Sequence, residues 1–282
     1  MADPLDQIRP LFRRLRDRLQ TSLPARRTPQ HFRFIGSQRR FLTSPDEQGT
    51  IALLQCLAPG LRRFLNVGAN AGYYCLLAES LGLDVLAFEP EPSAFRLLQR
   101  NLCLNHSRCL AIPAAVAADR GRASFYGTGT AGSLLAGISG TPRWDRRSVT
   151  TVPLDGLFAI GGIAPQSPDS LWLFDCEGAE PQALRGASEL LQATHPLLVL
   201  ELAPGRNPEA WRDALADLLM AGYSHLLACS SLVVGPARWR PLHPGAVADS
   251  GFHDNVLVLA EAHHQPFLER LPPGGPGLGR SG

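Results

Sequence analysis

Short apolar runs alternate with longer amphipathic segments along the middle of the chain, beginning near residue 63. The apolar runs predict buried strands, and the segments between them place apolar residues three or four positions apart, as on one face of a helix. This alternation is typical of βαβ units, in which helices cover a parallel sheet. The runs that predict strands are 63–67, 84–88, 109–116, 170–174, 196–202, 223–229 and 255–260.

The helical segments fit between these runs, so we expect a doubly wound α/β fold. Residues 231–252 form a long Pro- and Gly-containing link before the last run, which suits an antiparallel partner. The prediction is therefore a mostly parallel, seven-stranded sheet with one antiparallel strand. Helices are predicted within 71–82, 91–105, 178–192 and 207–222.

The two ends differ from this pattern. Residues 1–45 form a basic arm with ten Arg and three Asp, and apolar residues between Leu5 and Leu19 at helical spacing predict a short amphipathic helix. We expect this helix to pack its apolar side on the folded domain, residues 46–262. Residues 263–282 end in a Pro- and Gly-rich stretch and are predicted to be disordered.

Composition narrows the function. With 45% hydrophobic and 18% charged residues, the chain resembles an ordinary globular enzyme. No apolar run reaches the roughly 18 to 20 residues that span a bilayer, so we expect no stable membrane insertion and a cytoplasmic location. The net charge of +2 predicts no nucleic-acid partner. The chain has no lysine, which excludes a Walker A loop and a Schiff-base mechanism.

Cysteine and histidine spacing indicates no metal site. The six cysteines form no C-x-x-C pair, and the histidines and acids show no usual ligand spacing. A metal held by residues that only the fold brings together stays open at this point.

A glycine-bearing turn follows the first predicted strand, within "FLNVGANAGYYCLL" from Phe64 to Leu77. Gly68 and Gly72 allow a sharp turn and close backbone approach to a ligand, and the following helix offers free N–H groups to an anion. A dinucleotide site has G-x-G-x-x-G, whereas this turn has Asn70 and Tyr73 at the later glycine positions. The pattern alone is ambiguous, but the missing glycines argue against a pyrophosphate site.

Acidic residues follow two other predicted strands. Glu89 comes directly after 84–88, where a carboxylate can accept hydrogen bonds from ribose hydroxyls; it could also favour the following helix, with Pro90 near its start. Asp175 and Glu177 follow 170–174. Ligands of doubly wound sheets bind at the carboxyl ends of strands, so a site role for Asp175 is favoured over simple helix capping.

Five blocks, in this order, are similar to those of FkbM-type methyltransferases: "NVGANAGYY", "AFEPEPSAFRLLQRNLCLN", "VPLDGL", "FDCEGAEPQALRG" and "LLVLEL". The resemblance covers about Gly49 to Leu202, and the closing "HDNVLVLA" resembles the family's last strand. It implies the class I, Rossmann-like methyltransferase fold and S-adenosylmethionine as cofactor. Members of the family are generally associated with O-methylation of sugars, polyketides and related metabolites.

The resemblance also implies residue roles. Residues 68–73 would wrap the methionine part of the cofactor, Glu89 would hold its ribose, and Ala115 would lie near its adenine. Asn66 stands where many relatives have Asp. The expected cofactor residues are Asn66, Gly68, Ala69, Asn70, Gly72, Tyr73, Glu89, Pro90, Ala115 and Asp175.

The expected reaction transfers a methyl group to a hydroxyl of a small-molecule or glycan acceptor. An alcohol acceptor benefits from a base that takes its proton. The candidate catalytic residues are Asp175, Glu201 and Glu177, with Asp175 or Glu201 favoured as the base. His253 is interpreted as a surface residue. The sequence does not indicate an oligomeric state.

Two other functions use the same features. A Rossmann-type oxidoreductase would bind NAD through the turn and Glu89, although Asn70 and Tyr73 argue against it. A noncatalytic scaffold could keep the fold and bind the cofactor without turnover.

Overall fold

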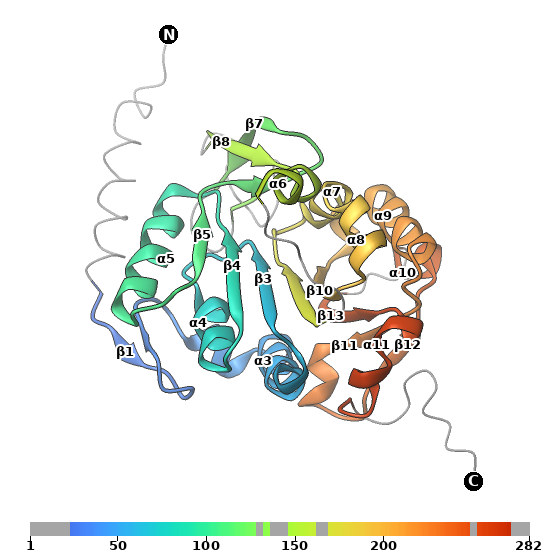
Figure 1. Cartoon of the computed structure of the whole chain (residues 1–282), viewed down its shortest axis with the longest axis horizontal. Coiled ribbons are helices and arrows are strands. Elements are labelled where there is room, and N and C mark those ends of the chain that lie inside the picture. The colour runs from blue at the N-terminus through green and yellow to red at the C-terminus, as the bar shows by residue number, and fades with distance from the viewer. Residues whose placement is uncertain (1–22, 128–131, 136–145, 162–168, 249–252, 272–282) are drawn as a thin grey trace.

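The computed structural model describes residues 23–127, 132–135, 146–161, 169–248 and 253–271. Within these residues, an eight-stranded sheet runs through the protein in the order β12-β11-β13-β10-β9-β3-β4-β5 (Figure 1). Strands β5, β4, β3, β9 and β10 are parallel, whereas β13 is antiparallel to both β10 and β11. The bounds are β3 Arg63–Val67, β4 Asp84–Phe88, β5 Leu110–Ile112, β9 Ser170–Phe174, β10 Leu197–Leu202, β11 His225–Ala228, β12 Trp239–Pro241 and β13 Asp254–Leu259.

This architecture confirms the doubly wound α/β fold, with two differences in the strands. The predicted run 109–116 divides into β5 and β6 (Ala115–Val116), and the intervening Pro113 has no N–H for a continuous ladder. The main sheet also gains β12, which pairs antiparallel with β11 at one edge. Strand β12 is short and partly exposed, so it lacks the apolar pattern that identifies a strand in a sequence.

Helices cover both faces of the main sheet (Figure 1). The predicted helix 178–192 is two helices, and between them the backbone at Gly186 passes so close to Ala117 that a Cβ there would lie 2.1 Å from its carbonyl oxygen. The helix bounds are α3 Pro45–Leu57, α4 Tyr73–Ser80, α5 Pro92–Leu104, α6 Leu154–Gly161, α7 Glu180–Arg185, α8 Ser188–Thr194, α9 Pro208–Met220, α10 Pro244–Ala248 and α11 Glu261–Leu268.

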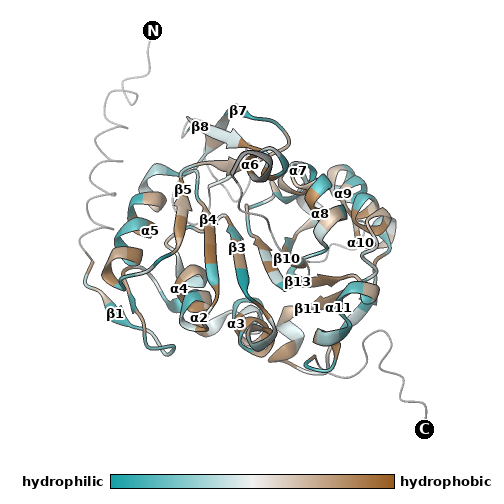
Figure 2. Ribbon diagram, in the orientation of Figure 1, coloured by the Kyte–Doolittle hydropathy of each residue, from teal (hydrophilic) through white to brown (hydrophobic). Residues whose placement is uncertain are grey.

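The strands divide their side chains between two cores. Along β9, Leu171 and Leu173 join one apolar cluster, while Trp172 and Phe174 join the other. The first cluster includes residues of α3, α4, α5 and α11, and the second includes residues of α7, α8 and α9. Figure 2 shows the apolar strands enclosed by helices that carry hydrophilic residues outside. Burial on both faces explains why the strands read as unbroken apolar runs.

A smaller sheet lies beyond one end of the main sheet (Figure 1). It has the order β6-β8-β7, with β7 at Gly121–Tyr126 and β8 at Arg146–Val152. Arg147 of β8 forms a buried ion pair with Glu91, whose side chain also caps α5 by accepting from the amide of Ala94. This ion pair attaches the small sheet to the main domain.

The described part of the N-terminal segment belongs to the domain. It forms β1 (Arg26–Arg27), β2 (Arg33–Phe34) and α2 (Arg39–Thr43). Phe41 stacks on Tyr73 of α4, with ring centroids 3.7 Å apart, and Phe34 meets the same ring edge-on at 5.4 Å. The domain therefore begins before the expected boundary at residue 46, because Phe34 is buried and Phe41 is partly buried against α4. The predicted helix near the N-terminus lies outside the described residues.

The C-terminal end also extends the domain. Helix α11 buries Phe267 and Leu268, and Leu271 is buried beyond it. The expected disorder from residue 263 is wrong up to residue 271, and residues 272–282 lie outside the description. None of the described helices is long and apolar enough to cross a membrane.

The packing of the N-terminal segment should depend on the buried side-chain amide of Asn101. Asn101 accepts a hydrogen bond from the amide of Ile35 at 2.8 Å and donates to the carbonyls of Ile35 and Ala71 at 3.0 and 2.8 Å. Asn101→Ala should lower the free energy of unfolding by about 1–3 kcal/mol, because it leaves buried backbone groups without partners. Urea denaturation measures this loss.

Asn105→Ala is the matched control, since Asn105 bonds Arg33 of the same segment at an exposed position that water can satisfy. Its cost should be about 0.5–1 kcal/mol. Equal losses in the two variants would contradict the role given to Asn101.

Candidate active site

The strand register brings four predicted site residues into one row. In the parallel strands, Val67 of β3 pairs with Phe88 of β4 and with Phe174 of β9, and Phe174 pairs with Leu200 of β10. The next residue along each strand is Glu89, Gly68, Asp175 or Glu201, in the order β4, β3, β9, β10. The chain reverses its direction of progress across the sheet between β3 and β9, which is where doubly wound folds bind ligands.

The turn after β3 requires glycine. Gly68 has a φ of +90°, and a Cβ there would lie 1.8 Å from the carbonyl oxygen of Asp175. The amides of Gly68 and Ala69 both donate to the carbonyl of Phe88, each at 2.9 Å. The turn is thus held between β4 and the loop after β9, and it leads into the N-terminal end of α4.

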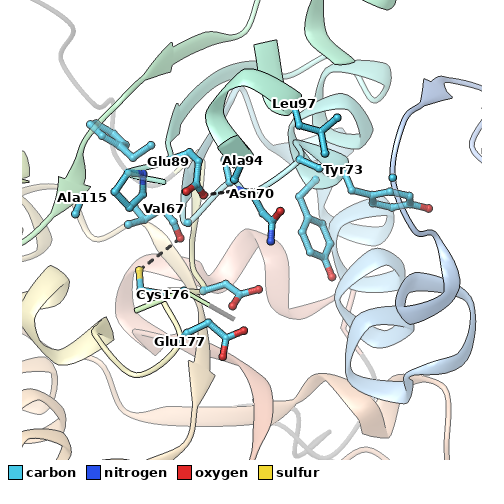
Figure 3. A pocket seen from close by; sticks show the side chains of 18 of the residues that line it. Val67, Asn70, Tyr73, Glu89, Ala94, Leu97, Ala115, Cys176 and Glu177 are labelled. Atoms are coloured by element: carbon cyan, nitrogen blue, oxygen red, sulfur yellow. Dashed lines mark hydrogen bonds between the residues drawn. The ribbon is translucent and has the colours of Figure 1, made fainter. Parts of the chain in front are cut away.

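Glu89 is buried and already ordered by backbone donors. Its Oε2 accepts from the amide of Asn70 at 2.7 Å, and its Oε1 accepts from the amide of Glu91 at 2.7 Å. Burial raises the pKa of Glu89 to about 8, although the bond from Asn70 lowers it. Each carboxylate oxygen keeps further acceptor capacity, so Glu89 can still receive hydroxyl donors. Figure 3 shows it between Ala115 and Asn70.

These residues line a cavity of about 500 Å³. One end is apolar, with side chains from the main sheet, α5 and the small sheet, and the other carries Glu47, Asp175 and Glu177. Residues of the N-terminal segment, including Arg40 and Phe41, also line it. The apolar end is formed by Val67, Phe88, Ala94, Leu97, Ala115, Val116, Phe125 and Leu134.

Three carboxylates meet at the charged end. Side-chain oxygens of Asp175, Glu177 and Glu201 all lie within 4.8 Å of one another. Burial and the neighbouring Glu201 raise the pKa of Asp175 well above its ordinary value, while Arg40 lowers it. Sequence spacing predicted no metal site, yet the fold creates this acidic cluster. The Arg40 guanidinium supplies a positive charge beside it, with Nη1 4.0 Å from Glu177.

Glu180 organises the loop that carries Asp175 and Glu177. Its Oε1 accepts from the amides of Cys176 at 2.6 Å and Gly178 at 3.1 Å. Burial raises the pKa of Glu180 to about 8, and Glu201 also raises it. Glu180 therefore holds this loop, from which Asp175 lines the cavity.

The structure brings most of the expected cofactor residues to the cavity, but not all. Asn66 is buried in β3 and its amide donates to the sulfur of Cys75 at 3.4 Å, so it does not line the cavity. Gly72 lies outside the lining as well and packs against Leu98 at the start of α4. The expected residues that line the cavity are Gly68, Ala69, Asn70, Tyr73, Glu89, Pro90, Ala115 and Asp175.

The catalytic candidates differ in whether they reach the cavity. Asp175 and Glu177 line the cavity, whereas Glu201 is buried behind them at the end of β10. His253 is exposed, and its Nε2 lies 3.3 Å from Oε1 of Glu201. Ala115 reaches the cavity from β6 of the small sheet, not from the third strand of the main sheet.

Sequence reasoning missed the contribution of the N-terminal segment. Sequence patterns assign Arg40 and Phe41 to the basic arm and Glu47 to the start of the predicted domain, and they give none of the three a role in the site. The signal that was available is the aromatic series Phe32, Phe34 and Phe41, since rings of this size in a short segment need an apolar surface to cover.

A match to a known protein family covers most of these site residues. Residues 66–225, more than half of the 282-residue chain, match the model of the methyltransferase FkbM domain. The chain belongs to this family. None of the curated proteins matches the chain.

Similar solved structures include methyltransferase FkbM from Methylobacillus flagellatus, with 18% identity, coverage of 71% of this chain and 44% of that one, and a TM-score of 0.45. A putative O-methyltransferase from Klebsiella pneumoniae has 14% identity, coverage of 92% and 91%, and a TM-score of 0.42. Precorrin-6y C5,15-methyltransferase from Geobacter metallireducens has 12% identity, coverage of 75% and 87%, and a TM-score of 0.37. Likenesses this low carry no argument about the acceptor of this FkbM protein.

The close approach at Gly68 gives a test of the turn. Gly68→Ala should cost well over 2 kcal/mol of unfolding free energy and abolish ligand binding at the turn, because the new Cβ meets the backbone of Asp175 as well as an unfavourable φ. Urea denaturation measures the loss.

Gly82→Ala is the control that separates the effect of an unfavourable φ from that of a backbone clash. Gly82 has a φ of +88° and no atom within 4 Å of its added Cβ, so that variant should cost only about 1–2 kcal/mol. A Gly68→Ala variant as stable as Gly82→Ala would refute the close approach.

Proposed function

We propose that this FkbM-family protein binds S-adenosylmethionine and transfers its methyl group to a hydroxyl oxygen of a small-molecule or glycan acceptor. The observation that carries the proposal is the row of Glu89, the Gly68 turn and Asp175 along one cavity at the carboxyl ends of adjacent strands. Family membership gives methyl transfer, and the carboxylates at the charged end favour a hydroxyl acceptor because they can accept its proton.

The cavity has parts that fit the cofactor. Its apolar end, with Ala115 and Phe125, suits an adenine ring, and the buried carboxyl of Glu89 suits a ribose diol. The turn at Gly68 and the following helix suit the amino acid part, since N–H groups at a helix N-terminus favour an anion. When bound, S-adenosylmethionine supplies a methyl group that its sulfonium has already activated.

Asp175 is the favoured base. It lines the cavity, and burial together with the neighbouring Glu201 disfavours its ionisation and raises its pKa, which makes its carboxylate a stronger proton acceptor. Asp175 would take the proton of the acceptor hydroxyl as the new C–O bond forms. Orientation of the acceptor against the methyl group can lower the barrier by roughly 7–11 kcal/mol.

The two alternative functions, NAD binding and a noncatalytic scaffold, require different features of the cavity. NAD binding needs room for a pyrophosphate at the turn, where Asn70 and Tyr73 stand in place of glycines. A noncatalytic scaffold would need no base and no raised pKa at Asp175. The residues of the cavity favour the methyltransferase over both.

Cofactor identity is tested by calorimetric titration with S-adenosylmethionine, S-adenosylhomocysteine and NAD. The first two should bind with micromolar dissociation constants, and Glu89→Gln should weaken them by about 10- to 100-fold, because a charge-assisted bond to ribose is worth roughly 1.5–3 kcal/mol. Since the pKa of Glu89 is about 8, its ionised fraction grows with pH. Wild-type affinity should therefore rise several-fold from pH 6.5 to 8.5, and that of Glu89→Gln should not.

Other results have clear meanings. Binding of NAD alone would overturn the methyltransferase proposal, and binding of none of the three would favour the scaffold. A Glu89→Gln variant with the same pH dependence as the wild type would remove Glu89 from the ribose site.

The base assignment is tested by Asp175→Asn with a panel of hydroxylated acceptors. Turnover at saturating S-adenosylmethionine should fall by about 10² to 10⁴, which is the usual contribution of a general base. Wild-type turnover should rise with pH, because the raised pKa of Asp175 must be passed before the base is ionised.

Asp213→Asn on α9 is the control, because Asp213 is exposed and lies outside the cavity lining. It should keep wild-type turnover. Near-normal turnover in Asp175→Asn would exclude Asp175 as the base.

A further inference from the structure

Negative side chains outnumber positive ones in the lining of the cavity. In the described part of the chain, the charged lining side chains are those of Arg40, Glu47, Glu89, Asp175 and Glu177. Arg40 is the one cation among them. Glu89 lies apart at the turn, so Arg40 shares the charged end with the other three carboxylates.

Arg40 has a defined position at this end. It belongs to α2, and its neighbour Phe41 stacks on Tyr73, the first residue of α4. This contact places α2 beside the N-terminal end of α4, directly after the Gly68–Gly72 turn. The first N–H groups of a helix have no acceptor within it and attract an anion, so a guanidinium nearby strengthens the attraction.

The Arg40 guanidinium is fixed by one ion pair but keeps N–H donors that a ligand can use. Its Nε forms an ion pair with Glu47, and its Nη1 lies 4.0 Å from Glu177, beyond hydrogen-bond distance. The Arg40 side chain is 43% exposed. Guanidinium has five N–H donors in a planar fork that matches a carboxylate, so the pair with Glu47 leaves the outer nitrogens available.

We propose that Arg40 binds the α-carboxylate of the methionine part of S-adenosylmethionine, while Asp175 and Glu177 face its α-ammonium group. This inference rests on the proposed cofactor. An α-amino acid carries one anionic and one cationic group on the same carbon, and one guanidinium beside two carboxylates is complementary to that pair. Arg40 lies outside residues 66–225, so the N-terminal segment adds this contact to the family's domain.

The arrangement has a consequence for specificity. Ligands with adenine and ribose alone would use the apolar end and Glu89, and would make no contact with Arg40. Asn66 has a neutral amide in place of a carboxylate, and this amide donates to the sulfur of Cys75, so it does not serve the ammonium group. Asp175 and Glu177 would fill that role from the neighbouring strand.

The test compares two ligands and needs no acceptor. S-adenosylhomocysteine and its decarboxylated analogue, which keeps the ammonium group, are titrated into wild type, Arg40→Gln and Arg39→Gln. Arg40→Gln should weaken S-adenosylhomocysteine by about 10- to 100-fold and change the analogue's affinity by less than about three-fold, because charged hydrogen bonds are strong only where the carboxylate is present. Arg39→Gln, an exposed neighbour on the same helix, should change neither.

A second variant guards against a folding effect. Arg40→Lys keeps a positive charge at this position, so its affinity for S-adenosylhomocysteine should fall less than that of Arg40→Gln. Equal loss of both ligands in Arg40→Gln, or no loss, would overturn the carboxylate contact while leaving the cofactor proposal intact. Failure of the wild type to bind S-adenosylhomocysteine would overturn both.

Discussion

The parallel register of β4, β3, β9 and β10 is the constraint on which the site depends. Backbone hydrogen bonds align the carboxyl ends of these strands, so the side chains at these ends emerge side by side. Glu89, Gly68, Asp175 and Glu201 are far apart in the chain and adjacent in space for this reason. A slip of one residue in any strand would turn its buried side chains to the other face, so two apolar cores hold the register in place.

Close backbone approach is the second element of the site. Gly68 passes so near the carbonyl of Asp175 that the two loops form one wall of the cavity. Glu180 holds the other side of that wall through the amides of Cys176 and Gly178. The wall therefore orients Asp175 and Glu177 before any ligand arrives, and such preorganisation is how enzymes place charge without reorganising during the reaction.

The N-terminal segment completes the cavity through aromatic packing. Phe34 and Phe41 bury themselves against Tyr73, and Asn101 satisfies the backbone of Ile35. These contacts bring Arg40 to four carboxylates that repel one another: Glu47, Asp175, Glu177 and Glu201 all raise its pKa against the effect of burial. One guanidinium is thus set in an acidic environment, which links the stability of the segment to the electrostatics of the site.

The sequence by itself determined the parallel core, the glycine turn and the acids that end the strands, because these are local: apolar runs, a turn that tolerates only glycine, and residues directly after a strand. It also led to the FkbM resemblance, which family membership confirms. Only the tertiary structure decided that Asn66 turns away, that Glu201 lies behind Asp175 near His253, and that Arg40 joins the cavity. Side-chain direction and contacts between distant segments depend on packing, and residue spacing along one chain does not encode them.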